Sequence, residues 1–224
     1  MFYPFIFTLK EEPSIIERLF KECFFIGNTM AKPAKFDRQK VIDKATNLYW
    51  KKGFHATSMR NLQTEIDMRP GSIYAAFGSK DGLFKEALRN YTDITLTLLE
   101  KLKVKYKSPT EVLKAFIKIQ VVDTAKDSPN GMCMLAKTIG ELTEDNQTLI
   151  DTTKTYMNEI ASEFIKLIEQ GQALGEINKD QNSEDLAIHV QIQIAGLRTF
   201  AKISNDKSKL ETMIDNIFVH YPFN

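Results

Sequence analysis

The sequence predicts an all-α fold, and three observations lead to this prediction. Apolar residues recur every three or four positions through most of the chain, which is the spacing of one face of a helix. The breaks between these segments are rich in Ser, Pro, Asn, Asp and Gly, which favour turns and helix caps. Convincing alternation of apolar and polar residues, the mark of a half-buried strand, is missing from the sequence. A chain of 224 residues with 43% hydrophobic content can form one small domain and one larger domain.

The expected helices follow one another with short connections. The first lies in the run VIDKATNLYWKKGF, which starts at Val41, and two short helices come next. The later helices are expected at residues 80–105, 109–125, 132–142, 146–172, 183–203 and 207–219. We divide the chain into an extension (1–29), a three-helix domain with a helix-turn-helix at about 58–77 (30–90) and a larger helical domain (91–224).

The segment from Thr57 to Phe84 contains both short helices and the start of the long one. We expect Thr57 to cap the first short helix, without a Glu or Gln three residues later to complete a capping box. Pro70 presets φ near the first position of the second short helix. Gly78 ends that helix, and Ser79 caps the long helix that follows. The turn between the short helices is so brief that they must cross.

The second short helix has two different faces. Ile73 and Phe77 lie one above the other and can dock on the first short helix. The opposite face carries only small residues: Gly71, Ser72 and Ala75. Such a face fits closely into the major groove of DNA, which admits one helix, and Arg69 at its leading end can reach base edges or phosphate. The pattern therefore predicts DNA binding, with thymine methyl contacts and DNA shape supplementing Arg69 in sequence recognition.

The segment from about Phe36 to Tyr91 resembles the N-terminal domain of TetR-family transcriptional regulators. The resemblance is carried by these residues: the run VIDKATNLYWKKGF, Thr57, Ser58, Met59, Leu62, the run GSIY at 71–74, Phe77, Ser79, Lys80, Asp81 and Leu83. The sequence departs from the family pattern at the turn. The usual small residues ending in Gly are replaced by Gln63, Glu65, Ile66 and Asp67, and Arg69 replaces a Ser or Thr cap. These departures leave the fold prediction intact, but the operator sequence does not follow from the resemblance.

The resemblance implies a homodimeric repressor that binds a double-stranded DNA operator and leaves it when a small-molecule effector binds the larger domain. The residues that it places at the DNA are Thr57, Ser58, Arg69, Pro70, Ser72, Tyr74, Ala75 and Lys80. Arg69, Pro70, Ser72 and Ala75 match positions that face bases, whereas Thr57, Tyr74 and Lys80 match positions that hold phosphates. The alternative readings are an aromatic ring that closes the small core for Tyr74, and solvated surface charges for Arg69 and Lys80.

Charge is distributed unevenly along the chain. Residues 31–90 hold 12 Lys and Arg against 6 Asp and Glu, or +6, whereas residues 91–224 hold 15 against 19, or −4. The basic third would attract a phosphate backbone. We expect Lys32, Lys35 and Arg38 to form a short flexible basic arm before the first helix. A charge run is often only a solvated face, so the arm alone is weak support for DNA binding.

The last two helices suggest a dimer interface. Apolar residues surround more of the helix at 183–203 than one buried stripe requires, and the closing helix adds another apolar set. Ala195 and Gly196 permit a close approach of helices. We expect a four-helix interface between two copies, the alternative being that these residues complete a monomeric core.

The middle of the chain is the expected entry point of the effector. Residues at helical spacing that would line an apolar pocket are Phe116, Gln120, Met134, Tyr156 and Ile160. The alternative is that they are ordinary core. The long helix at 80–105 begins in the DNA-binding unit and ends in the larger domain, so we expect it to transmit movement between them.

The sequence gives little support to an enzyme, a metal site or a cofactor site. The three histidines are far apart, and neither metal-ligand spacing nor a phosphate-binding Gly-rich loop is present. The two cysteines, Cys23 and Cys133, lack paired spacing, which fits a reducing cytoplasm. Cys133 stands near an expected helix start, where a thiol sensor of electrophiles or oxidants is one alternative and a buried, inert thiol is the other.

The first 29 residues lack the basic segment and cleavage motif of a signal peptide, and no run is long enough to span a bilayer. We expect translation to start at Met30, with the upstream residues an unneeded extension. The alternative is an amphipathic helix around Ile15 to Phe25 that binds a membrane or partner. For the whole chain, the alternative to a regulator is an all-α interaction protein of the same fold.

Overall fold

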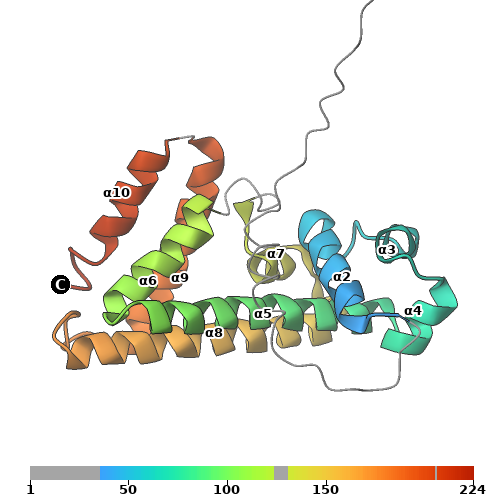
Figure 1. Ribbon diagram of the computed structural model, residues 1–224, viewed down its shortest axis with the longest axis horizontal. Helices are drawn as coiled ribbons and strands as arrows, with labels where there is room; N and C mark the ends of the chain where they lie inside the picture. The colour runs from blue at the N-terminus through green and yellow to red at the C-terminus, as the bar shows by residue number, and fades with distance from the viewer. Residues whose placement is uncertain (1–35, 124–130, 205) are drawn as a thin grey trace, which may run out of the picture.

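The computed structural model describes residues 36–123, 131–204 and 206–224, and every regular element in these residues is helical (Figure 1). The prediction of an all-α fold is confirmed. The elements are α2 (Arg38–Lys52), α3 (Met59–Ile66), α4 (Pro70–Phe77), α5 (Lys80–Lys105), α6 (Pro109–Lys118), the π-helix η1 (Ile119–Asp123), α7 (Met134–Glu141), the 3₁₀-helix η3 (Glu144–Asn146), α8 (Gln147–Ala173), α9 (Ser183–Ile203) and α10 (Lys207–Ile217). The predicted extension at residues 1–29 lies outside the described part of the chain.

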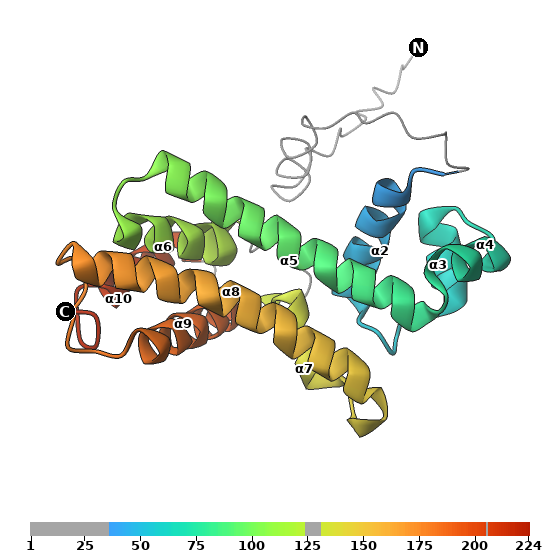
Figure 2. The ribbon, with the colours of Figure 1, turned by 90° about the horizontal axis from the view of Figure 1, so that it is seen from below.

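Helices α2, α3 and α4 gather around the start of α5 at one end of the molecule (Figures 1 and 2). Their shared core is aromatic at its centre, where the rings of Tyr49 and Phe54 lie 4.7 and 4.9 Å from the ring of Phe84. Leu62 of α3 and Ile73 of α4 are fully buried against this cluster. Each such side chain contributes about 1.5–3 kcal/mol when it leaves water, so a small unit of four helices is held in one arrangement.

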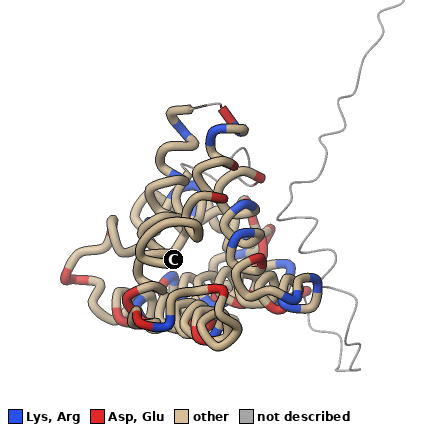
Figure 3. Tube along the Cα trace, turned by 90° about the vertical axis from the view of Figure 1, so that its left-hand side faces the viewer, with Lys and Arg blue, Asp and Glu red and all other residues tan. Residues whose placement is uncertain are grey.

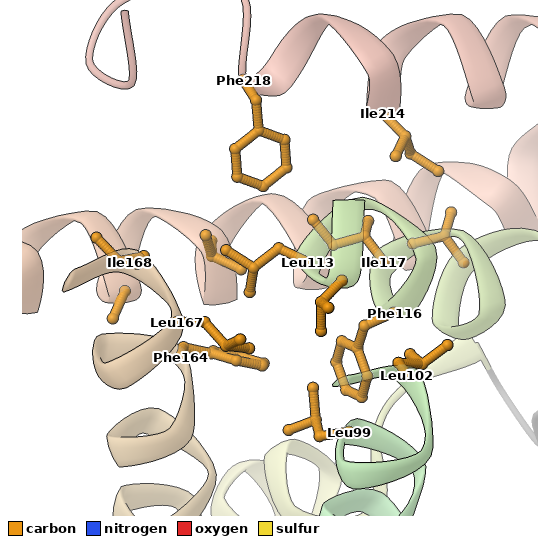
Figure 4. Packing of buried hydrophobic residues seen from close by; sticks show 14 of the residues in the cluster. Leu99, Leu102, Leu113, Phe116, Ile117, Phe164, Leu167, Ile168, Ile214 and Phe218 are labelled. Carbon is orange, nitrogen blue, oxygen red and sulfur yellow. The ribbon is translucent and has the colours of Figure 1, made fainter. Parts of the chain in front are cut away.

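The larger part of the protein is built on α5 and α8, which run side by side (Figures 1 and 2). Helices α6, α9 and α10 pack beside them and enclose a second core. Figure 4 shows this core, with Leu99 of α5, Leu113 and Phe116 of α6, and Phe164 of α8 among its members. The rings of Phe116 and Phe164 meet edge to face, with their centroids 5.4 Å apart. Helix α5 thus contributes buried residues to both cores.

The ends of the long helices follow from capping residues in the sequence. The Ser79 hydroxyl accepts a hydrogen bond from the backbone of α5, and the Asn182 side chain does the same for α9. The predicted bounds 80–105 and 183–203 agree with these two helices. The helix predicted at 109–125 differs, because α6 stops at Lys118 and the chain continues as a π-helix to Asp123. Among the described helices, none is long and apolar enough to cross a membrane.

Candidate DNA interface and ligand cavity

The turn between α3 and α4 is tight because Asp67 adopts a left-handed conformation, with φ 54° and ψ 49°. Its backbone N–H donates to the carbonyl of Gln63, which closes the end of α3. Arg69 is extended and Pro70 begins α4, as the fixed φ of proline favours. Asp67 therefore occupies a conformation in which glycine is more often found.

The two faces of α4 are divided as its helical spacing predicts. Ile73 and Phe77 are buried against the small core. Gly71, Ser72 and Ala75 are exposed on the other side, and a Cβ atom built on Gly71 would meet no heavy atom within 4 Å. The exposed face is small and open, so another surface can approach the α4 backbone closely.

Thr57 does not cap α3, and the prediction that it does is wrong. The capping residue is Ser58, whose hydroxyl accepts a hydrogen bond from the Asn61 amide at 3.1 Å. The Asn61 side chain accepts in return from the Ser58 amide, also at 3.1 Å, so an Asn completes the capping box. Thr57 is fully buried and donates its hydroxyl to the Gly53 carbonyl at 2.6 Å. Its side chain fixes the loop before α3 and is not presented at the surface.

Lys80 is also turned inward. Its Nζ donates to the Phe54 carbonyl at 2.6 Å and lies 4.2 Å from the centre of the Phe54 ring. Burial lowers the pKa of the Lys80 ammonium, against the opposing effect of Asp81 and Glu141. The ammonium thus joins the start of α5 to the loop after α2, and the phosphate contact expected of Lys80 stays a prediction.

Six of the eight predicted DNA contacts are exposed, among them Ser72 and Ala75 on the small face of α4. Arg69 and Pro70 are exposed at the leading end of α4, and Ser58 is exposed at the start of α3. Tyr74 is 48% exposed, so its ring does not close the small core. Arg69 lies beside the small face of α4, since both line the same shallow surface hollow.

Arg38 does not belong to a flexible arm. It is the first residue of α2, its guanidinium donates to the Ala76 carbonyl at 3.1 Å, and it forms an ion pair with Glu86. The same group lies 4.5 Å from the centre of the Phe77 ring. Arg38 therefore joins α2 to α4 and α5. The other two predicted members of the arm lie outside the described residues: Lys32 and Lys35.

A ligand-sized cavity of about 230 Å³ lies among α5, α6, α7, α8 and α9. Three of the predicted pocket residues line it: Phe116, Gln120 and Ile160. Two do not. Met134 is buried in the core shared with the helix-turn-helix unit, and the Tyr156 ring lies 4.9 Å from the Arg89 guanidinium outside the cavity. On both helices the next residue in the sequence lines the cavity instead, namely Leu135 and Met157.

The sequence interpretation missed the most polar part of the cavity wall. Tyr91 of α5 and Arg198 of α9 line the cavity, and both are buried. Cys133 also lines it, and its sulfur accepts a hydrogen bond from the Ala136 amide at 3.3 Å. An Arg within the apolar run of α9 was the available signal, because an arginine is almost never buried without a partner.

Helix α7 connects the cavity directly to the helix-turn-helix unit. The Trp50 indole donates to the carbonyl of cavity-lining Met132 at 2.9 Å. The Lys137 ammonium donates to the Trp50 and Lys51 carbonyls, each at 3.0 Å. The Glu141 carboxylate accepts from the Phe54 amide. Three side-chain contacts thus hold the end of α2 and its following loop to α7 and the residues just before it.

Helices α9 and α10 both expose apolar side chains. Ile188 and Ile192 of α9 are 53% and 63% exposed, and Met213 of α10 is 42% exposed. Ala195 and Gly196 continue the α9 surface without bulky side chains. Figure 3 views the molecule from the end that carries α10 and shows acidic and basic residues interspersed along the trace. An apolar helix surface of this kind is typical of a protein interface.

A helix-turn-helix with a small exposed face, joined to a helical domain that encloses a cavity, defines a class of ligand-responsive transcriptional regulators. Models of known protein families match both parts of the chain. The model of bacterial regulatory proteins of the tetR family matches residues 41–87, and that of the tetracyclin repressor-like C-terminal domain matches residues 109–217. The chain belongs to the TetR family and is a DNA-binding transcriptional regulator.

Individual relatives match over most of their length. The HTH-type transcriptional repressor ComR of Escherichia coli K12 is 29% identical over 83% of this chain and 89% of its own. The repressor DhaR of Mycobacterium sp. strain GP1 is 22% identical over 81% and 90%. Among solved structures, a cysteine-substituted TetR-family regulator CifR complexed with a 26-base-pair operator superposes with a TM-score of 0.74. The two chains are 25% identical, and the superposition covers 85% of this chain and 100% of the CifR chain.

Proposed function

We propose that this protein is a homodimeric repressor that binds its operator through α4 and is released when a small, largely apolar molecule enters the cavity. The observation that carries the proposal is the connection between the two sites, because cavity-lining Met132 is hydrogen-bonded to Trp50 of the helix-turn-helix unit. A ligand that moves the start of α7 therefore acts on α2 directly. The protein works in the cytoplasm, and its cavity binds a signal and performs no catalysis.

The small face of α4 is proposed to enter the major groove. Arg69, Pro70, Ser72 and Ala75 are placed at the bases, and Arg69 supplies the strong hydrogen-bond donors. Ser58 and Tyr74 are placed at phosphates, since their side chains are accessible. Thr57 and Lys80 act behind this surface by fixing the loops that present it. The 26-base-pair operator bound by the similar regulator CifR supports this mode of binding.

The exposed apolar surface of α9 and α10 is proposed to pair two copies. Two reading heads must match half-sites about one DNA turn apart, ~34 Å, so a change in their separation weakens binding sharply. Movement of α7 would change this separation, because α7 contacts the end of α2. Helix α5 keeps the connection between the two domains rigid, since its residues are buried in both cores.

The test is a binding measurement on duplexes selected from a random pool, followed by substitution of Arg69. Operator affinity of the parent protein should fall with salt, with a log-log slope of about −0.9 for each phosphate neutralised. Arg69→Ala should weaken selected-site binding by roughly ten- to a hundredfold, because a base contact is worth about 1–3 kcal/mol. Lys179→Ala, which removes an exposed charge in the larger domain, should leave the affinity unchanged.

Fluorescence anisotropy of a labelled duplex provides the readout, and circular dichroism confirms that each variant is folded. A folded parent protein that binds no selected duplex in a salt-sensitive way contradicts the proposal. The alternative of an interaction protein with the same fold would then be favoured.

A further inference from the structure

The cavity opens to the surface through a mouth that three of its lining residues define. Met132, which precedes α7, and Ala195 and Thr199 of α9 all line the cavity, and all three are exposed. A residue that faces both a cavity and the solvent marks the place where the two meet. We call these three residues the cavity mouth.

The cavity mouth lies on the exposed face of α9. Ile188, Ile192, Ala195 and Thr199 follow one another at intervals of four, three and four residues, so they share one face of the helix. All four are exposed, and we call them the α9 stripe. The last two members of the α9 stripe are therefore also part of the cavity mouth.

A surface hollow between α8 and α9 connects the cavity to the other half of the α9 stripe. Met157 and Gln191 line both the hollow and the cavity, and Ile188 and Ile192 line the hollow alone. Two polar residues of α8 complete its wall: Lys154 and Asn158. Apolar residues with polar ones beside them are the composition of a protein interface. The α9 stripe thus borders the cavity along its whole length.

We infer that the effector site is completed by a second copy of this chain, whose α9 stripe covers the cavity mouth in the dimer. The inference rests on the proposed function, since it gives the proposed pairing surface a part in ligand binding. A two-fold pair brings the same patch of both copies together, so each copy covers the cavity mouth of the other. A Cβ atom built on Gly196 would meet no heavy atom within 4 Å, so a partner helix can approach α9 closely there.

Coverage by the partner makes ligand binding and pairing depend on each other. The cavity of about 230 Å³ has the volume of about eight water molecules at ~30 Å³ each, which suits a ligand of about ten non-hydrogen atoms. In a single chain, an apolar ligand of this size would keep part of its surface in water at the cavity mouth. The dimer removes this surface from water, and by linkage each bound ligand tightens the pairing by the factor by which pairing tightens ligand binding.

Met132 places the DNA-binding unit in the same set of contacts. It belongs to the cavity mouth, and its carbonyl accepts the hydrogen bond from the Trp50 indole of α2. A ligand at the cavity mouth therefore lies between the partner copy and the residue that holds α2. A change in how the partner covers the cavity mouth reaches the reading head through this one residue.

The first test compares ligand binding by dimer and monomer, with 1-naphthol as an uncharged apolar probe of suitable size. Ile192→Lys should separate the two copies, and Ile192 does not line the cavity itself. Equilibrium dialysis of the full-length proteins should show 1-naphthol binding at least about tenfold more weakly to the variant, which corresponds to ~1.4 kcal/mol. Coverage of roughly 55 Å² of apolar surface at ~25 cal/mol per Å² is sufficient for this difference.

Two further variants accompany this comparison. Ile188→Lys places the same charge on the α9 stripe at another exposed residue outside the cavity wall and should weaken 1-naphthol binding equally. Val104→Lys, at an exposed residue of α5, should bind 1-naphthol like the parent protein. Analytical ultracentrifugation gives the oligomeric state of each protein, and circular dichroism shows that it is folded.

The second test measures coverage of the cavity mouth without a ligand. The thiol of Thr199→Cys should react with an alkylating reagent about tenfold more slowly in the dimer than in the Ile192→Lys background, because access limits thiol reactivity. Mass spectrometry of the peptide that contains the new cysteine distinguishes it from Cys23 and Cys133. Thr64→Cys, the same change at an exposed residue of α3, should react at equal rates in both backgrounds.

The possible results separate this inference from the proposed function. Equal 1-naphthol affinity of dimer and monomer, or equal alkylation of Thr199→Cys in both, overturns the inference and leaves an effector cavity within each chain. A folded Ile192→Lys protein that stays dimeric overturns it as well, because the copies then pair elsewhere. A parent dimer that binds no 1-naphthol near its solubility limit also overturns it, and the operator measurement without ligand then still tests DNA binding by itself.

Discussion

Individual charged residues of the helix-turn-helix unit serve its folding more than their sequence positions suggest. Arg38 pairs with Glu86 and lies over the Phe77 ring, and Lys80 is bonded to the Phe54 carbonyl. Both were expected at phosphates or in a basic arm. The positive charge of residues 31–90 therefore overstates the number of cations available to DNA, and Arg69 gains weight as an exposed one at the small face of α4.

Asp67 makes a residue-scale prediction possible. A left-handed conformation costs most non-glycine residues about 1–2 kcal/mol. Glycine avoids this cost, but it loses more backbone entropy on folding, which cancels part of the gain in stability. Asp67→Gly should therefore stabilise the protein by about 0.5–1 kcal/mol, measured by thermal or urea unfolding. Asp67→Asn removes the charge but keeps a residue that tolerates this conformation, so it should change stability little. A loss of stability in Asp67→Gly would show that the Asp67 carboxylate makes a contact worth more than the strain.

At the scale of elements, α7 is a second connection between the cavity and the DNA-binding unit, in addition to α5. The helix is short, but its residues reach three different backbone groups at the end of α2 and in the loop that follows. Gly53 in that loop has φ 88°, and any Cβ at this position would meet the Glu141 carboxylate. The contact thus depends on a glycine as well as on the polar side chains.

Removal of the Lys137 side chain should loosen the end of α2. The ammonium holds the Trp50 and Lys51 carbonyls, and charge-assisted bonds at a helix C-terminus are worth about 1 kcal/mol. Lys137→Met should therefore speed amide hydrogen exchange at residues 49–54 by about five- to tenfold, because exchange there reports local opening. Lys179→Met serves as the control. Equal exchange in both variants would show that α7 does not stabilise this region.

At the scale of the whole molecule, the proposed pairing of two copies through the exposed apolar surface of α9 can be tested by placing a charge on it. Ile192→Lys places a charge on this surface at a residue that is 63% exposed, so the fold of the single chain should be preserved. We expect a monomer in analytical ultracentrifugation and a loss of at least a hundredfold in operator affinity, since linked heads gain about 10²–10⁴ from avidity. Val104→Lys, at a 91% exposed residue of α5, should remain dimeric. A dimeric Ile192→Lys protein would place the interface elsewhere.

Local patterns account for the parts of the structure that the sequence predicted well. The bounds of α5 and α9 depend on capping side chains next to the helix in the chain, at Ser79 and Asn182. The two faces of α4 depend only on helical periodicity. The end of α6 was less accurate, because the π-helical turn at residues 119–123 is not marked by a local signal.

The differences between the expected and the observed surroundings of the candidate site residues share one physical cause. Thr57 and Ser58 are adjacent and both favour caps, and the choice between them depends on the reciprocal bond from Asn61. Lys80 turns inward because Phe54, distant in the sequence, offers a ring and a carbonyl. Arg198 enters the cavity wall because α9 packs beside the π-helix. Each outcome depends on which segments meet in space, and local sequence patterns do not show this.

Phe54 gives the molecule a common mechanical joint. Its backbone N–H is held by Glu141 from α7, and its carbonyl is held by Lys80 from α5. Helices α5 and α7 therefore contact the same residue, Phe54. Lys80 at the start of α5 binds its carbonyl, and Glu141 at the end of α7 binds its amide. Displacement of either helix strains the bond made by the other, so the two routes to the reading helices are not independent. Loss of either hydrogen bond should therefore weaken the effect of a bound effector on operator affinity by more than half, the share expected if α5 and α7 acted independently.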